Sequence, residues 1–170
     1  MAGMFIGESV HKVDSKGRVS IPADFRRVLQ DCDPKYDPDK GARVTIIYGD
    51  RRRNHLECYT AQAMEEVFER IKALPRGSKN RRMIEVMFTS QAHAATVDET
   101  GRLVLPAKLR DRVGITNEAV FMATGDTFQI VSTATYEAKL DEVSAWLDDL
   151  DDDVDPLTFL EPVQPSPVGG

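Results

Sequence analysis

Two arginines in this chain are placed to recognise an anion or the edge of a base. Arg18 and Arg102 each follow an aspartate by four residues and a glycine by one, in the pattern Asp-x-x-Gly-Arg. A guanidinium carries five N–H donors in a rigid fork that matches phosphate oxygens, or O6 and N7 of guanine. A carboxylate four residues earlier can orient that fork. The pattern therefore indicates nucleic-acid recognition, beside the simpler alternative of an Asp–Arg salt bridge that only locks the turn.

The two motifs belong to a longer internal repeat. "VDSKGRVSIPADFR" at 13–26 and "VDETGRLVLPAKLR" at 97–110 share seven of fourteen positions. In each copy, the aspartate can accept hydrogen bonds from backbone N–H groups of the turn, and the glycine can supply a positive φ angle. The expected turn residues are Asp14, Gly17, Asp98 and Gly101. Because a turn does not need arginine, its recurrence in both copies marks it as functional.

Other basic residues surround the turns. Lys12 and Lys16 lie close to Arg18 in the sequence, and both are candidates for contacting nucleic acid. The second copy has Thr100 where the first has Lys16, and it also gains Glu99. We therefore expect the two turns to be electrostatically unequal. The secondary basic candidates are the arginines of the two short helices that follow, Arg26 and Arg110.

The charge of the chain is divided between a body and a tail. Of 28 acidic residues, nine fall in residues 141–170, which hold no Lys or Arg. The remaining 28 − 9 = 19 acids face 22 Lys and Arg in residues 1–140, a net charge of +3. The overall charge of −6 therefore does not exclude nucleic acid as a partner of the body.

Several other classes of function lack support in the sequence. No apolar run reaches the length of a membrane span and no signal-peptide pattern opens the chain, so we expect a cytoplasmic protein without a membrane partner. Cys32 and Cys58 are isolated and are expected to be reduced thiols. No nucleotide-binding glycine motif, nucleophile motif or metal-ligand spacing is present. We therefore expect no enzyme activity, no metal, no cofactor and no small-molecule substrate.

The elements around the motifs repeat in the same order. Each half is expected to run strand, turn, strand, short helix, strand, strand, helix, and apolar periodicity predicts the longer helices. The expected limits are 7–54 with helix 60–75 for the first repeat, 79–90 for a linking helix, 91–134 with helix 133–150 for the second repeat, and 151–170 for an acidic disordered tail. Halves of roughly 70 residues are near the lower limit for independent stability. We therefore expect strands of both halves to share one sheet system.

These residues resemble a known group of proteins. An Asp-x-x-x-Arg signature at the end of a hairpin, then a strand, "IP" or "LP" and a short helix with a second arginine, resembles the AbrB/MazE/SpoVT superfamily of swapped-hairpin DNA-binding proteins. Two tandem copies after the opening "MFIGESVHKV" are similar to the MraZ family in particular, over roughly residues 4–150. The resemblance implies a β-rich α+β fold. In it, tandem SpoVT-AbrB-like halves form one pseudo-two-fold swapped-hairpin, split β-barrel domain with peripheral helices.

The resemblance also implies a function. Members of this family form ring-shaped homo-oligomers that bind direct repeats in double-stranded DNA. The repeats lie in the promoter of the division and cell-wall gene cluster that contains their own gene, which they usually repress, so a nucleoid association is expected. The DNA-contacting role carries over to Arg18 and Arg102, with Asp14 and Asp98 as motif partners. An alternative is a protein-interaction module, because relatives of this fold act as antitoxins and the tail "DDLDDDVDPLTFLEPV" mixes acids with apolar residues.

Overall fold

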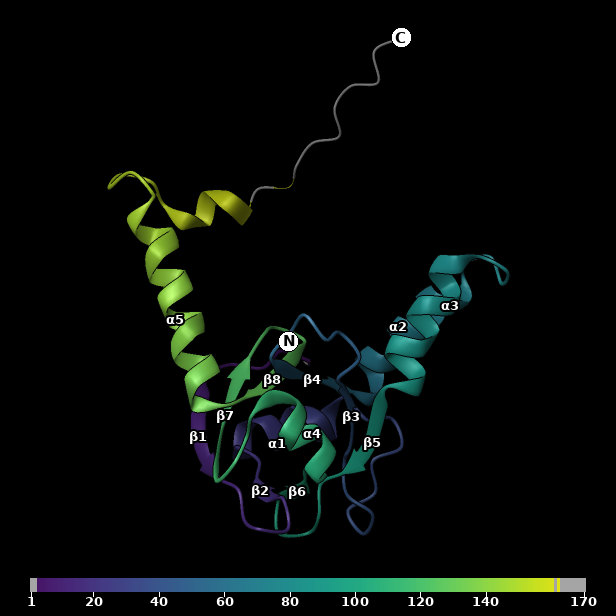
Figure 1. Ribbon diagram of the computed structural model, residues 1–170. Helices are drawn as coiled ribbons and strands as arrows, with labels where there is room; N and C mark the ends of the chain where they lie inside the picture. Colours follow the sequence, from purple (N-terminus) through teal and green to yellow (C-terminus); the bar gives the residue numbers. More distant parts are fainter. Residues whose placement is uncertain (1–2, 161, 163–170) are drawn as a thin grey trace. The chain divides into compact units, whose positions relative to one another are not determined.

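The computed structural model describes residues 3–160 and 162 and divides the chain into two compact units, with the boundary after Tyr136 (Figure 1). The first unit holds the eight strands described, with most of the helices, and forms the body of the protein. The expected β-rich α+β class is confirmed. None of the described helices is long and apolar enough to cross a bilayer.

Elements recur in one order along both halves. The first half contains β1 Glu8–Lys12, β2 Arg18–Ser20, α1 Ala23–Asp31, β3 Arg43–Ile47, β4 His55–Thr60 and α2 Ala61–Lys72. The link consists of α3 Lys79–Glu85 and a π-helical turn at Val86–Ser90. The second half contains β5 Ala92–Thr96, β6 Arg102–Val104, α4 Ala107–Val113, β7 Glu118–Ala123, β8 Thr127–Val131 and α5 Thr133–Asp148.

The main sheet has an order that reads the same from both ends. Its six antiparallel strands follow the order β1-β7-β8-β4-β3-β5. Exchanging the halves converts β1 into β5, β7 into β3 and β8 into β4, and leaves the order unchanged. Because β1 pairs with β7 and β5 pairs with β3, each half completes the sheet of the other. The two repeats therefore form one pseudo-two-fold domain.

The two motif hairpins are interlocked. β1 and β2 meet only at a single bridge between Val13 and Val19, and β2 pairs instead with β6 of the other half. The backbone N–H of Leu105 donates to the carbonyl of Gly17 at 2.8 Å, and Ile21 donates to Gly101 at 2.9 Å. These bonds extend the pairing into both turns. The two-stranded sheet of β2 and β6 lies at the lower end of the body in Figure 1 and is called the ribbon below.

Proline and aromatic residues fix the short helices on the core. Pro22 precedes α1 with φ −51° and Pro106 precedes α4 with φ −57°, a conformation that suits the first helical turn. The ring of Phe25 on α1 lies 5.2 Å from those of Phe5 and Phe128, measured between centroids. All three rings are buried. This packing draws together the N-terminal segment, the first half and the second half.

A buried acid organises the long loop between α1 and β3. The side chain of Asp33 is fully buried and accepts hydrogen bonds from Arg43 Nη2 at 2.5 Å and from the backbone N–H of Lys35 and Arg43 at 3.0 and 3.1 Å. An acidic side chain in a loop is usually solvated, but Asp33 bonds to Arg43 at the start of β3. The loop is therefore held at its base.

Replacing Asp33 with alanine is expected to lower the free energy of unfolding by about 1–3 kcal/mol, because the N–H donors around it would lose their acceptor. Hydrogen bonds from Arg43 hold the pKa of Asp33 below its usual value. A lowered folded-state pKa means that the stabilisation is present at neutral pH and is lost as the pH falls through that pKa. Urea unfolding of the wild type and of Asp33→Ala over a pH series measures this difference in the free energy of unfolding. Asp39→Ala, at an exposed position of the same loop, is the control, and equal losses in both variants would contradict the prediction.

The second unit starts inside α5. It contains most of that helix and a 3-10 helix, η2, at Pro156–Leu160. The ring of Phe159 lies 5.5 Å from that of Trp146, measured between centroids, so η2 folds against α5. Of the tail expected at 151–170, residues 161 and 163–170 lie outside the described residues.

Candidate nucleic-acid interface

The register of the ribbon brings the two motif arginines together. Arg18 lies opposite Val104, and Arg102 lies opposite Ser20. Since successive strand residues point to opposite faces, both arginines share one face with these two partners. Val19 and Leu103 point the other way and are buried in the core. The outward-facing residues Arg18, Ser20, Arg102 and Val104 are called the ribbon face below.

The first turn uses one aspartate both to build the turn and to orient the arginine. Asp14 Oδ1 accepts from the backbone N–H of Lys16 at 3.0 Å and of Arg18 at 2.9 Å, while Asp14 Oδ2 accepts from Arg18 Nε at 2.6 Å. The backbone and guanidinium donors of Arg18 lower the pKa of Asp14. Gly17 adopts φ +84°, as a turn of this kind requires. The turn interpretation and the oriented-arginine interpretation therefore describe the same geometry.

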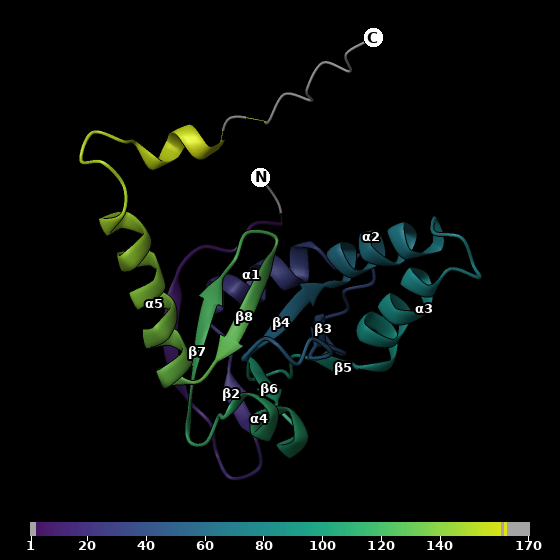
Figure 2. The same cartoon turned by 45° about the horizontal axis from the view of Figure 1, so that its top comes forward.

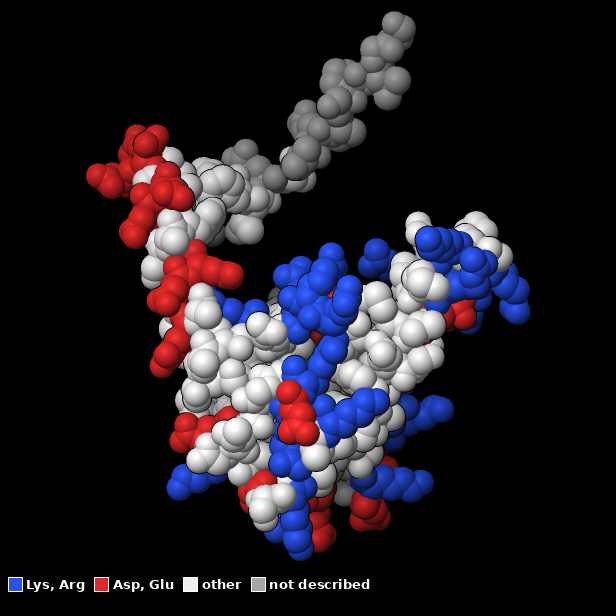
Figure 3. All heavy atoms as spheres, in the orientation of Figure 1, with Lys and Arg blue, Asp and Glu red and all other residues white. Residues whose placement is uncertain are grey.

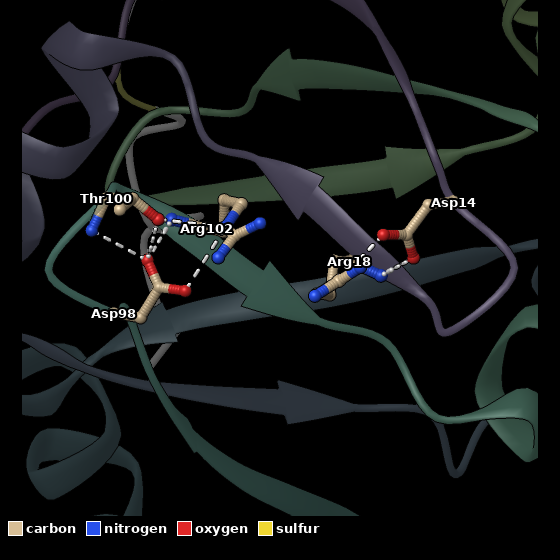
Figure 4. A network of polar contacts seen from close by, with 5 residues as sticks. All are labelled: Asp14, Arg18, Asp98, Thr100 and Arg102. Carbon is tan, nitrogen blue, oxygen red and sulfur yellow. Dashed lines mark hydrogen bonds and ion pairs between the residues drawn. The ribbon is translucent and has the colours of Figure 1, made fainter.

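The second turn repeats this arrangement with one difference. Asp98 Oδ1 accepts from the backbone N–H of Thr100 and of Arg102, both at 2.9 Å, and these bonds, Arg102 first, lower the pKa of Asp98. Arg102 Nε lies 3.3 Å from Asp98 Oδ2 and donates at 2.8 Å to the hydroxyl of Thr100. Figure 4 shows the two guanidinium groups facing each other along the ribbon, with the carboxylates outside them.

Both arginine forks remain available to a partner. Their side chains are 40 % and 39 % exposed, and the ion pairs engage Nε only. Within residues 3–160, no protein acceptor contacts the terminal Nη atoms of Arg18 or Arg102. Exposed ion pairs of this kind contribute at most about 1 kcal/mol to stability. The salt bridges therefore orient the arginines through Nε and leave the terminal Nη atoms available to bind a partner.

Each turn glycine lies in close contact with a residue of the opposite half. A Cβ on Gly17 would lie 2.1 Å from the carbonyl oxygen of Leu105, and a Cβ on Gly101 would lie 2.3 Å from Arg26 Nη1. Arg110 also lies beside Gly17, and its Nε donates to the Leu105 carbonyl at 2.9 Å. The secondary basic candidates Arg26 and Arg110 are thus half-buried behind the turn of the opposite half. The one sequence signal for this close contact between the halves is the glycine that recurs in both turns.

The two lysine candidates lie in different places. Lys16 is exposed in the first turn beside Arg18. Lys12 ends β1 on the main sheet, where it pairs in register with Glu118 of β7. The second turn carries the exposed Glu99 and the neutral Thr100 at the corresponding positions. The positive charge of the site is therefore concentrated at the first turn.

The described part of the chain contains no group of three or more His, Cys, Asp or Glu side chains that could hold a metal ion. What the geometry provides is a pair of arginine forks on an exposed two-stranded ribbon. This arrangement has donors for phosphate oxygens or base edges.

Two interlocked hairpins, each carrying an aspartate-oriented arginine, define a tandem swapped-hairpin protein. The family model described as "MraZ protein, putative antitoxin-like" matches this chain twice, at residues 4–87 and 87–153. The chain therefore belongs to the MraZ family, as the motif resemblance predicts.

Relatives cover nearly the whole sequence. The protein named transcriptional regulator MraZ of Ruegeria sp. (strain TM1040) is 56 % identical over 162 residues, which is 95 % of this chain and 97 % of the relative. The protein of the same name from Ruegeria pomeroyi is 54 % identical over the same shares. A more distant relative of that name, from Alkaliphilus oremlandii, is 34 % identical over 79 % of this chain and 85 % of its own length.

Proposed function

We propose that this chain is a transcriptional regulator that binds double-stranded DNA through the ribbon face, with sequence preference and without enzymatic activity. The observation that carries the proposal is the β2–β6 register, which sets Arg18 and Arg102 on one exposed face. The names of the relatives, transcriptional regulator MraZ, support the same class of function.

The ribbon face has the chemistry needed to contact DNA. The major groove admits a two-stranded β-ribbon, and arginine can donate from both Nη atoms to a guanine or to a phosphate. A serine hydroxyl at position 20 can reach a base edge, and the half-exposed Val104 can contact a thymine methyl. Because the aspartates already fix both guanidinium groups, binding costs less side-chain entropy than it would for free arginines.

A single ribbon face offers few contacts, so the proposal includes assembly. In a ring-shaped homo-oligomer, adjacent copies would set identical ribbon faces on successive direct repeats. Linked contacts raise the overall affinity by orders of magnitude without new chemistry. The target proposed from the family resemblance is the promoter of the division and cell-wall gene cluster that includes the chain's own gene, in the cytoplasmic nucleoid, with repression as the outcome.

The test is a fluorescence-anisotropy titration of DNA from upstream of the chain's own gene and of a scrambled DNA of equal length. We expect tighter binding to the upstream DNA, with log K falling by about 0.9 per phosphate contact for each unit of log salt concentration. Removing residues 151–170 should leave this preference unchanged. Equal binding of both DNAs, or preference lost with the tail, would contradict the proposal, and the latter result would favour the protein-interaction alternative.

A further inference from the structure

Basic side chains also gather outside the ribbon, on one side of the body. The connection between β3 and β4, residues 48–54, carries three consecutive arginines, and helix α4 carries further basic residues. Figure 3 shows blue side chains in a column over α4, which faces the viewer in Figure 1. The exposed members are Arg51, Arg52, Arg53, Lys108 and Arg112, which we call the basic track. None of them belongs to the ribbon face, so the track needs an explanation of its own.

Helix α4 joins the basic track to the first turn. Arg112 Nη2 donates a hydrogen bond to the backbone carbonyl of Tyr48 at 3.0 Å, and Lys108 Nζ lies 3.4 Å from the Tyr48 hydroxyl. The same helix places Arg110 beside Gly17. Figure 2 shows α4 next to β2 and β6, as Figure 1 does. The track therefore runs from the β3–β4 connection over α4 to the edge of the ribbon.

Much of the charge on the track is free to bind an anion. Residues 50–53 and helix α4 together hold six cations and two acids, a net charge of +4. Asp50 forms ion pairs with two of the arginines. Within the described residues, no acid lies within 4.0 Å of the charged groups of the other three members, Arg51, Lys108 and Arg112. Three cations of the track are therefore available to a partner.

The fold itself does not require these cations. The alignment of the two repeats places Asp24 of α1 at the position of Lys108, and Val28 at the position of Arg112. The connection between β7 and β8, which corresponds to the one between β3 and β4, consists of residues 124–126 and holds no Lys or Arg. Because the same elements form on the other side of the pseudo-two-fold axis without these residues, the charge of the track points to a partner.

We propose that the basic track binds the phosphate backbone of the double-stranded DNA that the ribbon face contacts, on the side of the first turn. The inference rests on the proposed function, because it extends that interface to a second set of contacts. A duplex with a ribbon in its groove presents a phosphate backbone on each side, and α4 lies beside the ribbon on one of these sides. Contacts of Lys and Arg with phosphates raise the affinity for any sequence, whereas contacts with base edges set the preference. The track therefore adds affinity without adding preference.

The full-length variant Arg51→Ala/Lys108→Ala tests this inference in anisotropy titrations of the upstream and scrambled DNAs at several salt concentrations. Loss of two phosphate contacts should raise the Kd of both DNAs by the same factor, roughly 10-fold at low salt, and lower the salt slope by about two units. The ratio of the two Kd values should stay that of the wild type. Arg51→Lys/Lys108→Arg should restore the affinity, because a phosphate contact needs the charge more than a particular geometry of donors.

Lys35→Ala/Lys40→Ala is the matched control, since it removes two positive charges from exposed positions of the loop between α1 and β3. It should bind both DNAs like the wild type. Circular dichroism and size-exclusion chromatography of each variant check the fold and the state of assembly. Arg51→Ala alone should lower the salt slope by about one unit, and it replaces the double variant as the test if that protein does not fold.

The inference is overturned if the double variant keeps the affinity and salt slope of the wild type, if the control loses as much affinity, or if the loss falls on the upstream DNA alone. A double variant that dissociates into smaller assemblies but binds DNA normally would assign the track to a contact between copies, which also overturns the inference. Arg18→Ala, titrated beside these proteins, separates the two proposals. Its loss of preference supports the ribbon face whether or not the track contributes affinity.

Discussion

Replacing Gly17 with alanine is expected to destabilise the body by about 2–4 kcal/mol, a large effect for a single methyl group. Gly17 has φ +84°, and an added Cβ would lie 2.1 Å from the carbonyl oxygen of Leu105. Leu105 belongs to the other half, and its backbone N–H also donates a hydrogen bond to the carbonyl of Gly17. The clash therefore separates the interlocked hairpins and cannot be relieved by a side-chain rotation.

Chemical unfolding of three variants separates the causes of this loss. Gly7→Ala tests a positive φ alone, since nothing lies within 4 Å of its Cβ position at φ +101°. Gly77→Ala has neither constraint and should be nearly neutral. Gly101→Ala should cost less than Gly17→Ala, because its Cβ meets the side chain of Arg26, which can move. A Gly17→Ala protein as stable as Gly7→Ala would show that the turn does not hold the halves together.

Replacing Arg18 with alanine is expected to weaken binding to the upstream DNA without unfolding the chain. Losing a guanine contact should cost about 1–3 kcal/mol, or roughly 5-fold to 150-fold in Kd, at particular bases. Losing a phosphate contact should instead lower the salt slope by about one unit. The turn should persist, because Asp14 still accepts from two backbone N–H groups. Anisotropy titrations at several salt concentrations measure both quantities.

Arg18→Lys is the matched control for this prediction. Lysine keeps the charge but loses the planar fork, so it should retain a phosphate contact and lose a bidentate guanine contact. Arg102→Ala should weaken binding less than Arg18→Ala, because the second turn has Glu99 and Thr100 where the first has Ser15 and Lys16. Loss of folding in Arg18→Ala would instead show that the Asp14–Arg18 pair serves stability alone.

The repeat made much of the fold predictable. Two copies of one pattern predict the order of elements in both halves, and the small size of each half predicts a shared sheet. The pairing partners were harder to predict. A hairpin between β1 and β2 is the simplest interpretation of the turn, yet Val13–Val19 is the single bridge between these segments. Which strands exchange depends on contacts between residues far apart in the sequence, such as Val19 and Leu103, and local periodicity carries no signal for them.

The site was predictable in its residue types but not in its geometry. The two motifs identify Arg18 and Arg102, but only the β2–β6 register shows that they share one face. Local sequence also does not show the surroundings of the candidate residues. Arg26 and Arg110 remain candidate contact residues, and only the structure shows that each lies beside the turn of the other half. The side chain of Asp33 is fully buried although it lies in a loop, and its ion-pair partner Arg43 lies ten residues ahead.

The shared ribbon face is tested most directly by titrating upstream and scrambled DNA with the double variant Arg18→Ala/Arg102→Ala. Lys40→Ala/Arg51→Ala, which removes two positive charges from exposed positions outside the ribbon, is titrated beside it. We expect the ribbon variant to bind both DNAs equally and weakly, and the control to keep the preference of the wild type. A ribbon variant that stays folded and still prefers the upstream DNA would contradict the assignment of this face to DNA.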